Sequence, residues 1–65
     1  MTVDVVGLGK ITATQEVLNA ILIAFMHQSN YYKNDGKTWN AELADTRSHS
    51  IYDALAKVGY YDNQE

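Results

Sequence analysis

Apolar residues are densest between Val17 and Met26, where the sequence VLNAILIAFM contains a single polar residue, Asn19. At about 100° per residue, one broad face of a helix collects five of these side chains, Val17, Leu18, Ile21, Leu22 and Phe25. Ile23 and Met26 point well away from that face. Because a helix that is apolar on more than one side needs more than one neighbour, the pattern predicts an intramolecular partner and a further contact.

A helix over residues 13–33 is predicted around this run. Its N-cap is either Thr12, which stands at capping-box spacing from Gln15, or Thr14. The sequence NDG at residues 34–36 marks the end, because glycine readily adopts the left-handed conformation that closes many helices.

A second helical pattern covers residues 38–58, with Thr38 as the expected N-cap. Its apolar positions fall within an arc about 160° wide, and they are Trp39, Leu43, Ala44, Ile51, Ala54, Leu55 and Val58. Because this phase is kept through the polar stretch at 45–50, one continuous helix is favoured. A shorter second piece starting at Ser48 or Ser50 remains open, since serine also caps helices.

Glycines are expected to shape both ends of the chain. Gly59 should end the second helix in a Schellman motif, with Tyr60 folding back on Leu55, and residues 59–65 form a C-terminal tail. Residues 1–12 are valine-rich and broken at the GLG sequence, so they predict one short strand or a small hairpin. Such a ribbon needs something to lie upon, because an isolated two-stranded sheet is barely stable in water.

The expected fold is mainly α, an antiparallel αα-hairpin with a short extended or β segment, and residues 1–65 form a single domain. Counting back from the loop gives four pairs across the hairpin: Tyr32 with Trp39, Phe25 with Arg47, Ile21 with Ile51, and Val17 with Leu55. We expect Trp39, Tyr32 and Tyr60 to be buried caps of the small core.

Part of the first helix has no partner in this arrangement, and we therefore expect a homodimer in which two hairpins form a four-helix arrangement. The predicted dimer interface consists of Ala20, Ile23, Ala24 and Met26. Chain length supports this, because a domain of 65 residues buries only roughly 60% of its unfolded surface. The sequence has no cysteine for disulfides, which leaves oligomerisation as the remaining source of stability.

Charge and hydropathy narrow the classes of partner. The net charge is −3, and the five Lys and Arg residues are scattered among eight Asp and Glu residues, which makes nucleic acid an improbable partner. The apolar run is about half the length needed to cross a bilayer. We expect a soluble, cytoplasmic protein without membrane contact.

The sequence offers no convincing catalytic or cofactor set. The GLG turn lacks the third glycine of a dinucleotide-binding fingerprint, since Thr12 stands in its place. Asp45, His49 and Asp53 share one helix face and are the best metal geometry available, but a solvated acidic face is the favoured interpretation. A serine close to a histidine could act as a nucleophile, but a helical hairpin offers no pocket that would shield it from water. We expect no cofactor, no metal and no enzymatic activity.

Exposed aromatic and charged residues are the candidates for binding a partner protein. Tyr31 and Tyr61 fall off the predicted helix contacts, and exposed tyrosines are typical interface anchors. Arg47, opposite Phe25, is either a packing residue or a paired interface arginine. The remaining candidates form an acidic face, Glu42, Asp45 and Asp53.

Two resemblances bear on function. The order strand, helix, helix in a dimer, with the sequence DGKT at 35–38, resembles the ribbon-helix-helix DNA-binding family, whose paired N-terminal strands enter the major groove. Against it stand Asp4 in the strand and the negative net charge. The stretches HQSNYYK at 27–33 and IYDALAKVGYYD at 51–62 resemble small uncharacterised helical-hairpin proteins of phages and prophages of Gram-positive bacteria. That resemblance implies an accessory protein that binds a host or phage protein.

The favoured interpretation is a non-enzymatic protein-interaction or inhibitor module that acts as a homodimer. A ribbon-helix-helix-type DNA-binding regulator and a structural or assembly component are the alternatives. The sequence leaves the partner and the biological process open.

Overall fold

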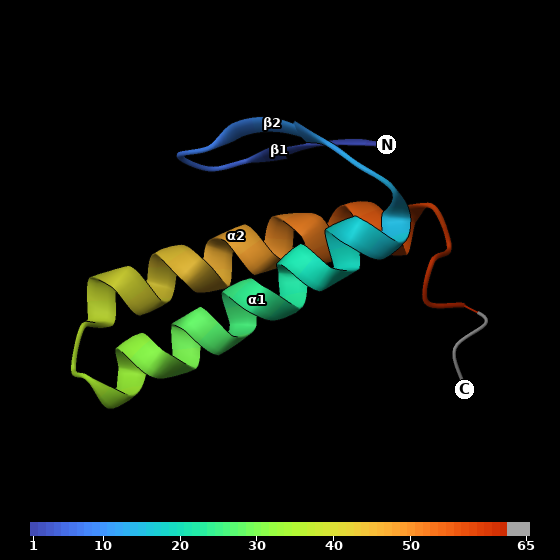
Figure 1. Cartoon of the computed structure of the whole chain (residues 1–65). Coiled ribbons are helices and arrows are strands. Elements are labelled where there is room, and N and C mark those ends of the chain that lie inside the picture. Colours follow the sequence, from blue (N-terminus) through green and yellow to red (C-terminus); the bar gives the residue numbers. More distant parts are fainter. Residues whose placement is uncertain (63–65) are drawn as a thin grey trace.

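The computed structural model describes residues 1–62, which form two strands followed by two helices (Figure 1). The elements are β1 (Thr2–Val5), β2 (Gly9–Thr12), α1 (Gln15–Asn34) and α2 (Thr38–Lys57). The two helices lie side by side as an antiparallel hairpin, and the β-ribbon lies over them, next to α2 (Figure 1). The mainly helical fold with an N-terminal β segment is therefore confirmed.

The N-terminal segment is a hairpin, which decides between the two predicted forms. β1 and β2 pair antiparallel with Val5 opposite Gly9, and the Leu8 N–H donates to the Val5 carbonyl at 3.0 Å. Gly7 has a φ of 77°, a left-handed conformation that favours glycine at this turn position. Alternate residues of β1 are buried, so Val3 and Val5 enter the core while the opposite face of the strand is exposed.

The ends of α1 follow from one side-chain cap and one glycine. The Thr14 hydroxyl accepts from the Val17 N–H at 3.2 Å, so Thr14 is the N-cap and the helix begins at Gln15. The predicted alternative, Thr12, belongs to β2, where its hydroxyl shares a 2.8 Å hydrogen bond with another threonine. At the other end Gly36 has a φ of 75° in a Schellman motif, as the NDG sequence predicts.

α2 is continuous from Thr38 to Lys57, so the favoured prediction of one helix is confirmed and the alternative start at Ser48 or Ser50 is not used. The prediction of Thr38 as N-cap is wrong, because Lys37 takes that position and makes no side-chain cap. The Lys37 N–H closes the end of α1 by donating to the Tyr32 carbonyl at 2.9 Å, so a single residue serves both helix ends. The short connection leaves no separate capping residue.

The C-terminal end of α2 forms as predicted. Gly59 has a φ of 76°, and the Tyr60 N–H donates to the Leu55 carbonyl at 3.0 Å, which completes the Schellman motif. Of the predicted tail at 59–65, residues 63–65 lie outside the described part of the chain.

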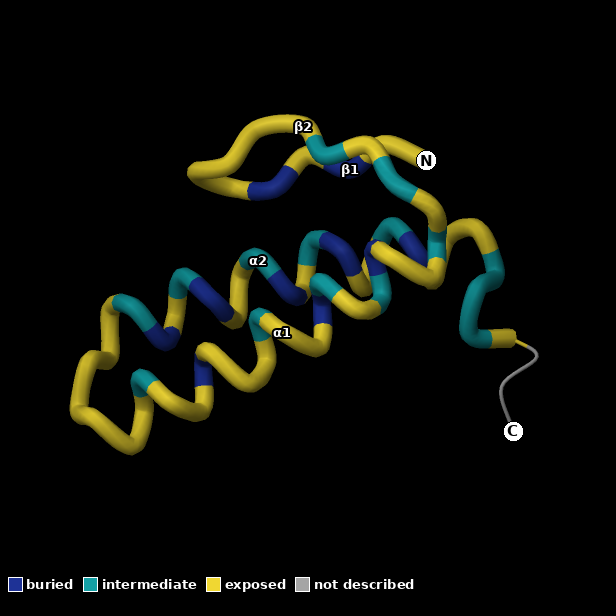
Figure 2. The backbone as a smooth tube through the Cα atoms, viewed as in Figure 1, coloured by how far each residue is buried: buried dark blue, intermediate teal, exposed yellow. Residues whose placement is uncertain are grey.

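The core lies where the ribbon and the two helices meet (Figure 2). Its buried members come from β1, α1 and α2, and they are Val3, Val5, Leu18, Leu22, Ile51 and Leu55. Towards the interhelical loop the buried positions of α2 are Ala41 and Ala44, which are too small to continue a wide core. Large side chains near the loop are consequently left near the surface.

Two predicted core residues are exposed. Trp39 is 72% exposed, because its neighbours near the loop form no apolar layer deep enough to cover an indole. Val17 is 48% exposed, because the contact between the helices centres on Leu18 and Leu22 and turns Val17 outwards. Tyr32 and Tyr60 are half-buried. The predicted pairing of Phe25 with Arg47 is confirmed, with the guanidinium carbon 5.9 Å from the ring centre.

Within the described residues, neither helix combines the length and hydropathy needed to traverse a lipid bilayer.

Candidate functional site

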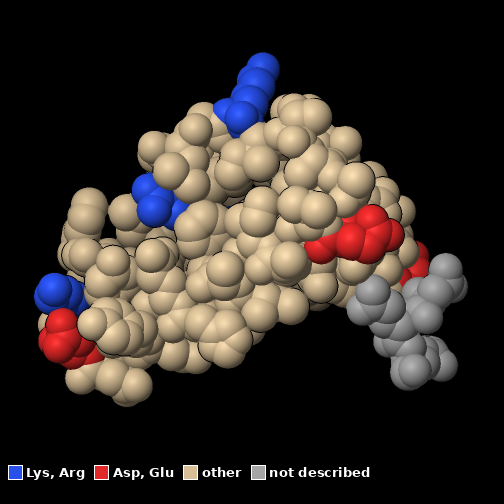
Figure 3. Space-filling view, in the orientation of Figure 1, with Lys and Arg blue, Asp and Glu red and all other residues tan. Residues whose placement is uncertain are grey.

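The outer face of α1 carries a long stretch without charged residues. Between Glu16 and Lys33 the helix carries no Asp, Glu, Lys or Arg. The surface over the middle of α1 in Figure 3 accordingly shows neither blue nor red. An apolar helix face without charge is unusual for a surface that meets only water.

All four residues predicted for the dimer interface lie exposed on α1, and they are Ala20, Ile23, Ala24 and Met26. Ile23 is 45% exposed and Met26 is 51% exposed. The β-ribbon does not change this, because it packs against α2 and covers the other side of the helical pair. We call the exposed surface formed by these four residues the α1 outer face.

A groove of about 510 Å³ adjoins the α1 outer face at Met26. All of its lining residues come from the two helices, and they are Leu22, Met26, Asp45, Ser48, His49 and Tyr52. Leu22 is buried, whereas Met26 and Tyr52 are each about half exposed. The apolar α1 outer face therefore continues into the space between the helices.

Near the groove lies a buried hydroxyl without a hydrogen-bond partner. Ser29 is 1% exposed, and its Oγ makes no hydrogen bond of normal geometry. The hydroxyl faces Asp45, whose carboxylate pairs with Lys33 Nζ at 3.3 Å. The Ser29 hydroxyl is the largest cause that lowers the pKa of Asp45 below its usual value; burial comes next and opposes it, and the Lys33 ammonium lowers the pKa further.

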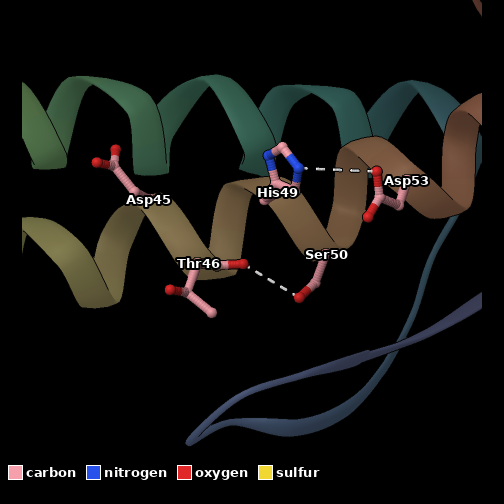
Figure 4. Close-up of a pocket in the computed structure, with 5 residues that line it drawn as sticks. All are labelled: Asp45, Thr46, His49, Ser50 and Asp53. Carbon is pink, nitrogen blue, oxygen red and sulfur yellow. Dashed lines mark hydrogen bonds and ion pairs between the residues drawn. The ribbon is translucent and has the colours of Figure 1, made fainter.

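The residues predicted to have the best metal geometry lie along the outside of α2 (Figure 4), and we call these three residues, Asp45, His49 and Asp53, the acidic stripe. His49 Nε2 lies 4.0 Å from Asp53 Oδ1, and Asp45 is one turn earlier on the same helix. Within residues 1–62 no three His, Asp or Glu side chains come together as a metal site would require. The side chains of Asp45, His49 and Asp53 are all at least half exposed to solvent.

The serines near His49 are engaged by the helix backbone. The Ser48 hydroxyl donates to the Asp45 carbonyl at 2.9 Å, and the Ser50 hydroxyl donates to the Thr46 carbonyl at 3.1 Å (Figure 4). Neither hydroxyl is held by His49 in the arrangement that activates a serine nucleophile.

Two of the partner-binding candidates have intrachain roles. The Tyr61 hydroxyl donates to Asn19 Oδ1 at 2.9 Å, and its ring stacks on Tyr52 with centres 5.1 Å apart, so Tyr61 is not the free contact residue that we predicted. Burial raises the pKa of this tyrosine. Tyr61 reaches Asn19 because the chain turns after Gly59 and returns to α1. Helix periodicity does not predict such a turn.

Arg47 is a packing residue that fastens the ribbon to the helices. Its Nε donates to the Val6 carbonyl at 3.0 Å while its guanidinium lies over Phe25. The other predicted contact residues remain at the surface: Tyr31 is 67% exposed, and Glu42, Asp45 and Asp53 are exposed.

The sequence analysis missed a second exposed apolar surface at the tip of the ribbon. Trp39 at 72% exposure is accompanied there by Val6 at 47% exposure. A hollow of about 230 Å³ is lined by Val6, Trp39, Glu42, Leu43 and Thr46. Hairpin turns are usually polar, so the two apolar turn residues on either side of Gly7, Val6 and Leu8, are the signal that could have revealed an apolar surface here.

Comparison with known proteins returned no matching family model, curated protein or solved structure. The β-ribbon itself bears on the ribbon-helix-helix resemblance. Both of its strands come from one chain, whereas that family pairs one strand from each of two chains.

Proposed function

We propose that this protein is a non-enzymatic protein-interaction or inhibitor module that acts as a homodimer through the α1 outer face. The observation that carries the proposal is the uncharged stretch of α1 between Glu16 and Lys33, with Ile23 and Met26 about half exposed in its middle. Apolar helix faces of this kind are typically buried against a partner.

The energetics support association. An interface of standard size buries about 800 Å² on each partner, roughly a fifth of the 4466 Å² surface of this chain. Complete burial of Ile23 and Met26 would contribute about 1 kcal/mol each beyond their present burial. A chain of 65 residues gains more from such an addition than a larger domain does, because its own core is small.

The resemblance to small phage and prophage proteins supports a host or phage protein as the target of the dimer. The two stretches that carry it, at 27–33 and 51–62, belong to the last turns of α1 and to the end of α2 with the turns that follow. Tyr31 lies in the first of them at 67% exposure and is a candidate anchor.

The double substitution I23K/M26K tests the dimer. Two lysines on each copy would place unpaired charges in the interface, and we expect the dissociation constant to rise by at least about 100-fold. Sedimentation equilibrium at micromolar concentration should give a dimer for the natural chain and a monomer for the variant, with equal helical content by circular dichroism.

The matched control is L8K, because Leu8 is 49% exposed at the ribbon tip, away from the α1 outer face. This variant should remain dimeric. A natural chain that sediments as a folded monomer, or a double variant that stays dimeric, would contradict the proposal.

A further inference from the structure

Trp39 is the least covered large apolar side chain of the described chain, at 72% exposure. It does not stand alone, because Val6, which is 47% exposed, lines the same hollow. A tryptophan left in water beside further apolar side chains is the composition of an interface hot spot rather than of an ordinary surface.

The hollow beside Trp39 has one charged lining residue. Of the five residues around it, Val6, Trp39 and Leu43 are apolar, Thr46 is polar, and Glu42 carries a carboxylate. The Thr46 hydroxyl already donates to the Glu42 backbone carbonyl at 2.9 Å. Among the described ion pairs none involves the Glu42 side chain, so its carboxylate is free to meet a cation.

Arg47, the arginine of the neighbouring α2 turn, is already engaged. Arg47 Nε donates to the Val6 carbonyl at 3.0 Å, and the guanidinium lies over Phe25, on the side of the ribbon tip that does not line the hollow. Trp39 and Glu42 are three residues apart, so an indole ring and a carboxylate stand next to each other on one face of α2. This pair suits a guanidinium, which can lie flat on an indole while it donates to a carboxylate.

We propose that Val6, Trp39, Glu42 and Leu43, the Trp39 surface, bind an arginine side chain carried on an apolar segment of a partner protein. The inference rests on the proposed role as a protein-interaction module, and it names the contact chemistry of the partner. The negative charge of Glu42 selects the cation, and the apolar side chains select the residues that flank it.

Trp39 also provides the measurement, since it is the single tryptophan of the chain. Its fluorescence is followed while a short peptide of alternating leucine and arginine is added to the full chain. We expect a saturable change. Peptides in which glutamine replaces arginine, or glycine replaces leucine, should each bind about tenfold more weakly, because each lacks one of the two interactions.

Two variants locate the effect. E42Q should weaken binding of the leucine–arginine peptide by about threefold to tenfold. D53N is the matched control, because Asp53 is also an exposed carboxylate of α2 but lies about three turns from Glu42 and does not line the hollow, and it should leave binding unchanged. Calorimetry with W39A, which removes the ring, should show no measurable binding.

Equal binding of the three peptides, or an unchanged affinity in E42Q, would overturn this inference. A Trp39 fluorescence change on dilution of the protein alone would also overturn it, because a second copy would then cover the surface. The peptide response should persist in I23K/M26K. If the natural chain dimerises but shows no fluorescence change with the peptide, the arginine site alone is refuted. If the natural chain is a monomer but does respond to the peptide, the dimer alone is refuted.

Discussion

At the scale of single residues, Arg47 joins parts of the fold that are far apart in sequence. Its side chain reaches the Val6 carbonyl in the ribbon and the Phe25 ring in α1 from a position in α2. Arg47 thus fixes the ribbon tip over the helices. Because this hydrogen bond is exposed to water, we expect it to contribute about 1 kcal/mol, less than a buried bond from a charged donor.

Gly7→Ala should disturb this contact. A Cβ at Gly7 would lie 2.8 Å from Arg47 Nη2, and the φ of 77° is itself unfavourable for alanine. The matched control is Gly9→Ala, which has the same φ of 77° but open space around its Cβ. We expect the Gly7 variant to lose about 1 kcal/mol more than the control in urea unfolding. The difference should vanish in an Arg47→Ala background; a difference that persists would contradict the role of Arg47.

Asp45 makes stability depend on pH. Its pKa in the folded chain is below that of the unfolded chain, so the ionised carboxylate stabilises the fold. This contribution is complete above the unfolded pKa of about 4, and it is lost as the pH falls through the lower folded pKa. D45N should therefore be slightly less stable than the natural chain at pH 7 and equally stable at strongly acid pH. The effect is small, because the side chain is 50% exposed.

The prediction is tested by measuring the urea midpoints of the natural chain and of D45N across this pH range. Asp53 is also an exposed carboxylate of α2, with 60% of its side chain exposed, so D53N is the comparison. A D45N deficit that persists undiminished at acid pH would show that the asparagine itself, and not the lost charge, is responsible.

At the scale of the elements, each helix is delimited by local interactions that a few neighbouring residues supply. Thr14 caps the start of α1, and Gly36 and Gly59 close α1 and α2 in Schellman motifs. These features were predictable, because their chemistry depends on residues within one helical turn. The start of α2 was mispredicted, because the backbone N–H of Lys37 is used by the preceding helix.

Thr14→Ala should destabilise the protein by about 1 kcal/mol, since the Val17 N–H loses its acceptor. Thermal unfolding followed by circular dichroism measures the loss. Thr12→Ala is the control, because Thr12 lies in β2 and its hydroxyl bond to Thr2 is exposed to water. If Thr12→Ala proved the more harmful substitution, Thr14 would not be the effective cap.

At the scale of the whole molecule, the ribbon provides a neighbour for the helical pair within the chain. From the sequence we expected a second copy of the chain to cover the excess apolar surface of α1. The ribbon already covers part of the core through Val3 and Val5. Ile23 and Met26 remain uncovered after this packing. The α1 outer face and the Trp39 surface therefore lie on different elements and can bind different partners.

The sequence by itself determined the two helices and their C-terminal ends, because hydrophobic period and capping chemistry are local. It left open whether the N-terminal segment is one strand or a hairpin. It also identified Ile23 and Met26 as residues without an intrachain partner. Only the tertiary structure decided that Val17 and Trp39 are exposed, that Tyr61 returns to Asn19, and that Arg47 fastens the ribbon. Burial depends on which neighbour covers a position, and here those neighbours are about 40 residues apart along the chain.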